Sequence, residues 1–196
     1  MNIFQSHHDF LKDRAALLLK HAQEPGPHQQ ESIARFRRLE SFSSLSSGDV
    51  GALGSLQLKH ALAVVAVENG FESWSDLKQE LDKAAETSRL AEVRDQFYPP
   101  RSEVFSNNWF PNYPKAKAVH TVSGGFLLPY RHHFFICESG FVSNLGLSDE
   151  LPEWEAIGRD WVHPLHVRSW LRLNSLYADI LKSKEERQTP DVSEKR

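Results

Sequence analysis

The amino-acid sequence predicts an α+β fold, in which an N-terminal helical part packs on a small antiparallel sheet with covering helices. Two observations support this class. Apolar residues recur at helical spacing through the first half of the chain. Short apolar runs bounded by turn residues follow in the second half, before one closing amphipathic helix. We therefore expect a helical domain over residues 1–97, a small α+β domain over 101–182 and a disordered tail over 183–196, which is polar and lacks aromatic residues.

The first two predicted helices are defined by apolar stripes and by the residues that stop them. Ser6 caps a helix that ends before Pro25, and a shorter helix follows with Ile33 and Phe36 on one face. Residues 41–55 are rich in serine and glycine, which favours an irregular connection.

A helical corner after this connection gives the clearest local pattern. Residues 56–67 are nearly all apolar, which is typical of a helix that is buried on most sides. An Asn-Gly pair ending at Gly70 stops this helix, because glycine adopts a positive φ without steric cost. Ser73 begins the next helix with Asp76 in capping-box spacing, and that helix extends to about Arg94.

The corner resembles a helical module of bacterial proteins, often found just before ankyrin repeats, in which one helix ends in a GF-x-SW-x-x-L turn and a second helix follows. The residues that carry this resemblance are Gly70, Phe71, Ser73, Trp74 and Leu77. The resemblance implies an architecture and no chemistry. We expect Phe71 and Trp74 to be buried, since they would wedge between the two helices.

Aromatic residues are concentrated in the second half, where short strands are predicted. These strands cover residues 119–122, 126–130 and 133–137, with glycine and proline turns nearby. Short helices are predicted over 139–145 and 149–158, before the closing helix.

Two further patterns lie in this half of the chain. They are LLPY with a following FF pair, at residues 127–130 and 134–135, and W-x-x-I-G-x-D-W at residues 154–161. Together they look like a family of bacterial proteins of unknown activity. This second resemblance also implies an architecture without a particular chemistry.

Composition and charge narrow the possible functions. The chain has 196 residues, a net charge of −3 and a single cysteine, with an isoelectric point of about 6.4. An acidic chain does not favour nucleic-acid binding through bulk electrostatics, and the lack of an apolar run of about 18 residues argues against a membrane span. One thiol and an N-terminus without an export signal lead us to expect a cytoplasmic protein.

Polar side chains near the ends of predicted elements form one candidate pocket. The residues concerned are Arg131, His132 or His133, Asp160 and His163. Aspartate and histidine together can carry acid–base catalysis, and arginine can hold a carboxylate or a phosphate. The alternative is that Asp160 caps a helix, Arg131 pairs with a surface acid and the histidines pack.

The histidines do not indicate a metal site, and we expect neither a metal nor a cofactor. His133 and Cys137 share one face of a strand but lie four residues apart, roughly 13 Å at about 3.3 Å per residue, so they cannot bind one ion together. No CxxC or HExxH pattern occurs. Cys137 follows an apolar run, which is typical of a buried, unreactive thiol.

An acidic stretch over residues 138–160 offers a surface for a basic protein partner. Glu150, Glu153 and Glu155 are the residues expected to make this contact. A solvated acidic face would have the same composition.

These observations lead to an intracellular, non-catalytic protein-interaction or regulatory module as the predicted function. The alternative is a small enzyme with the His, Asp and Arg pocket in the second half. A weaker alternative is nucleic-acid binding through the helical corner, whose second helix carries more acidic than basic residues. We expect a protein partner and no membrane, and the sequence does not specify the oligomeric state.

Overall fold

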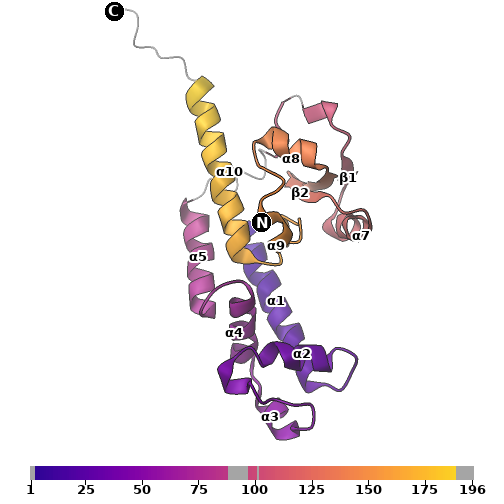
Figure 1. Cartoon of the computed structure of the whole chain (residues 1–196), viewed down its shortest axis with the longest axis vertical. Helices are drawn as coiled ribbons and strands as arrows, with labels where there is room; N and C mark the ends of the chain where they lie inside the picture. Colours follow the sequence, from indigo (N-terminus) through magenta and orange to yellow (C-terminus); the bar gives the residue numbers. More distant parts are fainter. Residues whose placement is uncertain (1–2, 88–96, 101, 189–196) are drawn as a thin grey trace, which may run out of the picture. The chain divides into compact units, whose positions relative to one another are not determined.

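A computed structural model describes residues 3–87, 97–100 and 102–188 of the chain. The chain divides into two compact units, Met1–Lys83 and Ala84–Arg196. Helices and one small antiparallel sheet make up the described residues, which confirms the α+β class (Figure 1). Among the described helices, none combines the length and the apolar character that spanning a membrane requires.

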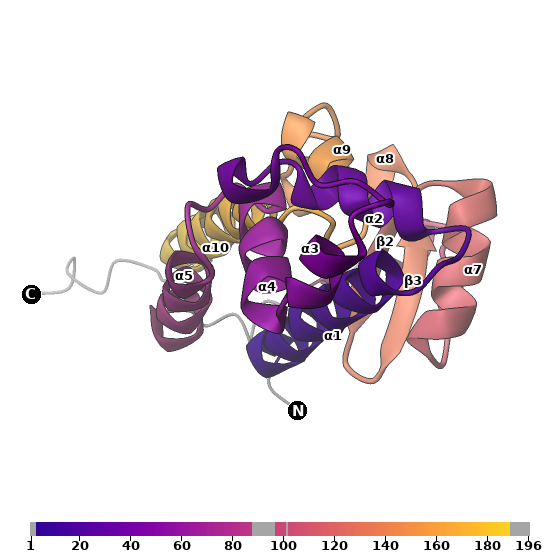
Figure 2. The ribbon, with the colours of Figure 1, turned by 90° about the horizontal axis from the view of Figure 1, so that it is seen from below.

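The first unit is built from helices, and no strand occurs among its described residues. Its helices are α1 (Ile3–Gln23), α2 (Gln29–Phe36), α3 (Val50–Ser55), α4 (Leu58–Glu68) and α5 (Trp74–Thr87), with a 3-10 turn at Glu40–Phe42. Helix α1 packs against α2 and α4 (Figure 2). The core between them buries Leu11, Leu18 and Val64.

The segment over 41–55 contains more regular structure than its composition predicts. Asp49 caps α3, because its side chain accepts a backbone N–H at 3.0 Å. The side-chain amide of Gln23 donates to the carbonyls of Leu53 and Leu56 at 3.2 and 3.1 Å. A polar residue of α1 therefore holds in place a segment that was expected to be an irregular connection.

The corner between α4 and α5 forms a regular helix stop. Gly70 has a φ of 85°, and the N–H groups of Gly70 and Phe71 donate to the carbonyls of Val67 and Ala66, each at 3.0 Å. This pair of bonds is a Schellman motif. Phe71 is buried as expected, whereas Trp74 is only partly buried.

The second unit contains a three-stranded sheet and helices. Its described elements are a 3-10 turn at Ser102–Val104, β1 (Asn108–Phe110), α7 (Tyr113–Ser123), β2 (Phe126–Tyr130), β3 (His133–Cys137), α8 (Ser139–Leu145), α9 (Pro152–Ala156) and α10 (Val167–Gln188). The strands are antiparallel in the order β1-β3-β2, so β3 is central. The strands predicted over 126–130 and 133–137, and the helix predicted over 139–145, match β2, β3 and α8.

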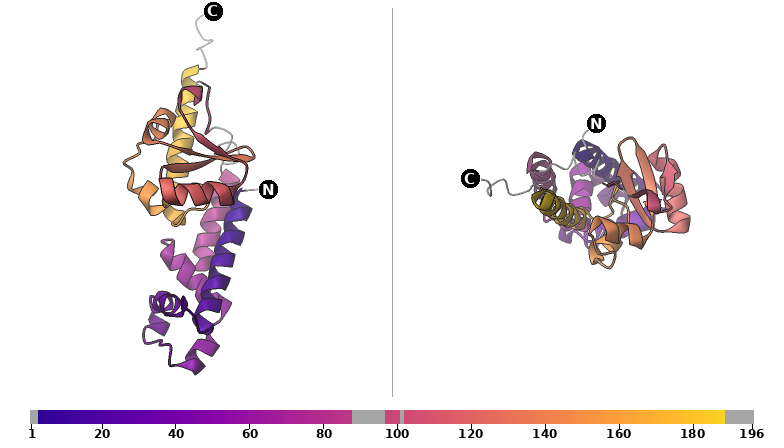
Figure 3. Two further views of the ribbon diagram at one scale, coloured as in Figure 1. Left: turned by 90° about the vertical axis from the view of Figure 1, so that its right-hand side faces the viewer. Right: turned by 90° about the horizontal axis from the view of Figure 1, so that it is seen from above.

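The two faces of this sheet pack against different helices, because successive side chains along a strand point in opposite directions. Leu127 and Ile136 pack with Ala116 of α7, which lies along one face (Figure 3). On the opposite face the ring of Phe135 lies 5.3 Å from that of Phe141 in α8. The sheet is therefore covered on both sides by helices of its own unit.

The prediction of a strand over 119–122 is wrong, because these residues belong to α7. Asn112 caps this helix by accepting the N–H of Lys115 at 3.1 Å. Pro114 lies in the first turn, where its missing N–H costs nothing. These start signals outweigh the preference of β-branched residues for strands.

The predicted boundary of the helical domain at residue 97 also needs correction. Phe97 packs in the second unit, where its ring centroid lies 4.8 Å from Trp161 and 4.9 Å from Tyr177. Residues 88–94, predicted to continue the second corner helix, lie outside the described residues.

Helix α10 continues through Gln188, into the segment predicted to be a disordered tail. Residues 183–188 are mostly lysine, glutamate, arginine and glutamine, which are good helix formers. The Lys184 ammonium also donates to the carbonyl of Leu145 at 3.1 Å. The predicted tail is therefore too long at its start, and its remaining part, 189–196, lies outside the described residues.

Candidate functional site

Asp160 is the centre of the polar cluster that the sequence analysis singled out. The residue lies beside β2 in a parallel bridge to Leu127. The Leu127 N–H donates to the carbonyl of Arg159 at 2.9 Å, and the Trp161 N–H donates to the carbonyl of Leu127 at 3.0 Å. This pairing extends the sheet past β2 and leaves the Asp160 carboxylate fully buried.

The buried carboxylate accepts four hydrogen bonds. Oδ2 accepts the Tyr113 hydroxyl at 2.7 Å and the Lys117 ammonium at 2.9 Å. Oδ1 accepts the N–H groups of Val162 and His163, each at 3.0 Å. Tyr113 and Lys117 both reach the carboxylate because residues four apart lie on the same face of α7.

Burial favours the neutral states of three titratable groups near Asp160, which are Tyr113, His120 and His163. Burial first, and then the nearby Asp160 carboxylate, raise the pKa of Tyr113 above its ordinary range, so its hydroxyl stays protonated. Burial lowers the pKa of His163, which Asp160 raises and Lys117 lowers to smaller extents. Burial, followed by Lys117, lowers the pKa of His120, whose Nε2 lies 3.2 Å from the carbonyl of Gly125.

These shifts predict that the protein loses stability as the pH falls below about 6.5, the ordinary histidine pKa. Because the folded-state pKa values of His120 and His163 are lowered, the unfolded chain binds protons that the folded chain does not. Stability is therefore complete above about pH 6.5 and declines towards the lowered folded pKa, by up to about 1.4 kcal/mol per pH unit for each histidine. Urea unfolding between pH 7.5 and 5.5 measures this decline. We expect His163→Gln to flatten it, and parallel curves for the two proteins would contradict the assignment.

The structure brings together only two of the predicted pocket residues. His163 lies beside Asp160, and its ring contacts that of Tyr113 at 4.1 Å. Arg131, His132 and His133 are exposed at the β2–β3 hairpin. Arg131 lies four residues along the chain from Leu127, the bridge partner of Asp160, which is roughly 13 Å in a strand.

Sequence analysis missed Tyr113 and Lys117 as partners of Asp160. Tyr113 and Lys117 are four residues apart and follow the helix cap Asn112. This spacing indicates that the two side chains share a face, but only if 113–123 is taken as a helix. Because a strand was predicted over 119–122, the shared helical face of Tyr113 and Lys117 was not considered.

The arrangement at Asp160 favours a structural tether over acid–base catalysis. A general base needs an acceptor site within reach of the substrate proton, and both carboxylate oxygens already accept two hydrogen bonds. The Tyr113 hydroxyl is likewise engaged as a donor. The network fastens the chain after α9 to α7, and it satisfies a charge that would otherwise be buried at a high cost.

No group of three or more His, Cys, Asp or Glu side chains within the described residues is placed to hold a metal ion. Cys137 is buried, and its Sγ lies 3.5 Å from the carbonyl of Phe126. Burial raises the pKa of the Cys137 thiol. A thiol in this state is protonated and poorly nucleophilic.

The acidic stretch has less unpaired charge than its sequence indicates. Glu150 is exposed, but Glu153 is buried and forms an ion pair with Arg172, with N and O atoms 3.0 Å apart. Glu155 is exposed and pairs with Arg159, whose Nε donates at 2.8 Å. Two of the three glutamates expected to contact a basic partner therefore already have a cationic partner within the unit.

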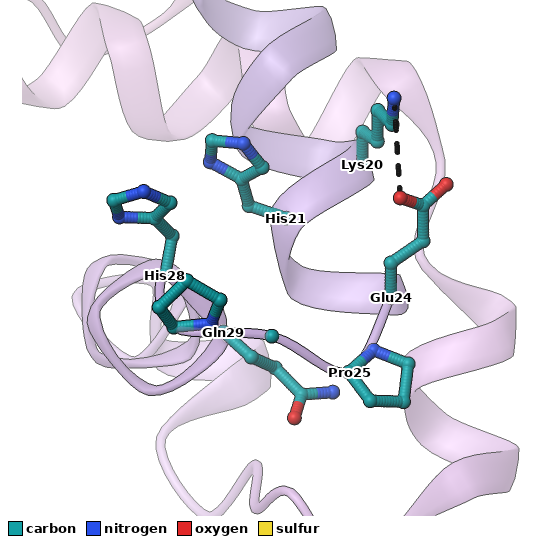
Figure 4. Close-up of a pocket in the computed structure, with 8 residues that line it drawn as sticks. Lys20, His21, Glu24, Pro25, His28 and Gln29 are labelled. Atoms are coloured by element: carbon teal, nitrogen blue, oxygen red, sulfur yellow. Dashed lines mark ion pairs between the residues drawn. The ribbon is translucent and has the colours of Figure 1, made fainter.

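A small pocket lies in the first unit, at the turn between α1 and α2 (Figure 4). It has a volume of about 230 Å³. The rings of His21 and His28 stack beside it with centroids 4.9 Å apart, and Lys20 pairs with Glu24 at 3.9 Å on its other side. This volume is smaller than the roughly 300–1,000 Å³ typical of small-molecule sites.

A partly exposed aromatic group lies at the hairpin end of the sheet in the second unit. We call it the aromatic end, and it consists of Tyr98, Trp109, Tyr130 and Arg131. The ring centroids of Tyr98, Trp109 and Tyr130 lie 5.0 to 6.0 Å apart, and the Arg131 guanidinium lies 5.2 Å from the Tyr130 ring centroid. Trp109 is 41% exposed, which is unusual for a residue of this size.

Comparisons with known protein families, with functionally characterised proteins and with solved structures each found no match. The resemblances of the helical corner and of the second half therefore stay predictions from their motifs.

Proposed function

We propose that the chain is a non-catalytic interaction module that binds a protein segment at the aromatic end of its second unit. The observation that carries the proposal is the exposure of Trp109. Its ring stacks on the buried Phe135, with centroids 4.8 Å apart and planes 30° apart. A tryptophan that is held in place yet exposed loses little conformational freedom on binding, and such residues are enriched among interface hot spots.

Charge around the aromatic end favours an acidic partner. No aspartate or glutamate occurs between Glu103 and Glu138, the stretch that supplies β1 and the β2–β3 hairpin. Arg131, His132 and His133 are exposed at that hairpin. The occupant that fits is a protein segment with an apolar or aromatic side chain for Trp109 and acidic residues on either side.

Ring geometry favours such a segment over single-stranded nucleic acid. Base stacking needs free ring faces, whereas Trp109 meets Tyr98 at 72° and Tyr130 at 73°, in edge-to-face contacts. A phosphate backbone also needs several cations along its path. Within the aromatic end itself, Arg131 is the cation present.

The test is selection of peptides from a library of random dodecamers, followed by titration of a selected peptide. We expect acidic sequences with an aromatic residue, and at least a 30-fold loss of affinity in Trp109→Ala, which corresponds to about 2 kcal/mol. Val122→Ala is the control, because Val122 is 89% exposed and lies on α7. Its affinity should stay within twofold of the original.

Two further measurements separate the alternatives. Arg131→Glu should lower the affinity for the acidic peptide and reduce the salt dependence of its binding. Circular dichroism shows whether each variant keeps its fold. Equal affinities for the Trp109 and Val122 variants would contradict the proposal. Trp109-dependent binding of oligothymidine, without peptide binding, would replace it with nucleic-acid recognition.

A further inference from the structure

Two arginines of the first unit bind the carboxylate of Glu68, and a third arginine lies within electrostatic range of it. Glu68, the last residue of α4, accepts two hydrogen bonds from Arg35, from Nε at 2.8 Å and from Nη2 at 2.7 Å. Arg38, just after α2, donates to the same carboxylate at 3.0 Å. Only 11% of the Glu68 side chain is exposed, so this ion pair is largely withdrawn from water.

Arg14 of α1 is the third arginine of the group, and its charge is not neutralised. Its Nη1 is buried without a hydrogen-bond partner among the described residues. Burial lowers the pKa of Arg14, and the neighbouring positive charge of Arg35 lowers it further, while Glu68 opposes both effects. A buried guanidinium N–H without an acceptor is unfavourable, the more so because the group is charged.

Three positive charges stand against the Glu68 carboxylate, and the Glu31 carboxylate also acts on Arg35, so the group keeps an excess of at least one positive charge. The carbonyl end of α4 contributes a partial charge of about −0.5, which still leaves the group positive. Guanidinium groups present several N–H donors in a planar fork that matches the oxygens of phosphate and carboxylate. A ligand that balances this site is an oxyanion.

We infer that Arg14, Arg35 and Arg38 form a binding site for a phosphate group. At neutral pH a phosphate monoester carries about −1.5 to −2 charges and three acceptor oxygens, enough to offset the positive charge of the group. The group supplies Arg14 with the acceptor that it lacks, and Glu68 orients Arg35 and Arg38. Inorganic phosphate and the phosphate of a small organic ester share this chemistry.

Isothermal titration of the full chain at pH 7.5 with inorganic phosphate and with methyl phosphate tests this site, at an ionic strength balanced with chloride. We expect saturable binding with one site, and at least a tenfold loss of affinity in Arg14→Gln. Lys12→Gln removes the same charge two residues away on α1, at an exposed side chain, and should change the affinity by less than twofold. Methyl phosphate that binds as tightly as inorganic phosphate indicates an ester ligand, and tenfold weaker binding indicates free phosphate.

A second variant keeps the test valid if Arg14→Gln does not fold. The Arg38 side chain is 58% exposed, so Arg38→Gln should fold normally and lower the phosphate affinity at least threefold. Thermal unfolding with and without phosphate gives the shift in the unfolding midpoint that phosphate causes. An arginine with a purely structural role would not change this shift. This shift should vanish in Arg14→Gln and persist in Lys12→Gln. No saturable binding in the original protein, or equal losses in the Arg14 and Lys12 variants, would overturn the inference.

Discussion

Asp160→Ala is expected to destabilise the second unit by about 3–5 kcal/mol, because the change removes one partner of a buried charge network. The substitution leaves the Lys117 ammonium, the Tyr113 hydroxyl and two backbone N–H groups without their acceptor. Urea unfolding followed by circular dichroism measures the effect. A large loss of stability is expected if Asp160 tethers the segment that follows α9 to helix α7.

Two matched variants separate the tether from a general effect of charge. Lys117→Met leaves the fully buried Asp160 carboxylate with three hydrogen bonds but without its cation, so it should cost about 1.5–3 kcal/mol, less than Asp160→Ala. Tyr113→Phe removes one hydrogen bond to a charged group and should cost about 1.5–3 kcal/mol. If Asp160→Ala cost no more than either of these, the carboxylate would not be the anchor of the network.

Trp154→Ala is expected to cost about 3–5 kcal/mol, the range for truncating a large buried aromatic side chain. Trp154 is fully buried, with ring centroids 5.0 Å from Phe126 and 5.5 Å from Trp161. Its indole N–H donates to the carbonyl of Ser148 at 3.0 Å. Truncation therefore creates a cavity and removes the hydrogen bond to Ser148.

The control for this prediction is Trp74→Ala in the first unit. Trp74 is only partly buried, so we expect a loss of about 1–2 kcal/mol, within the ordinary range for single substitutions. Thermal unfolding of both variants by near-ultraviolet circular dichroism allows the comparison. A Trp74 variant as unstable as the Trp154 variant would mean that the helical corner depends on its tryptophan more than its exposure indicates.

Local patterns predicted those parts of the fold that depend on a few neighbouring residues. The Asn-Gly stop at Gly70 and the apolar runs of β2 and β3 are of this kind. Strand β1 was missed, since it has only three residues and is held by pairing with β3. Helix α7 was mistaken for a strand in part because its cap lies several residues upstream of the β-branched positions.

The same distinction applies to the candidate sites. Asp160 and His163 are three residues apart, so a local turn is enough to bring them together. Tyr113 and Lys117 approach Asp160 across more than forty residues, and Arg35 meets Glu68 across 33. Contacts of this range depend on how helices pack, which residue spacing in one chain does not specify.

The most direct test of the proposed interaction is to map a selected acidic peptide onto the isotope-labelled chain by NMR. Binding at the aromatic end predicts that amide shifts change at Tyr98, in β1 and at the β2–β3 hairpin, while those around Asp160 stay in place. Shift changes centred on Lys117 and His163, or on the exposed Glu150, with the β1 amides unmoved, would contradict the proposal.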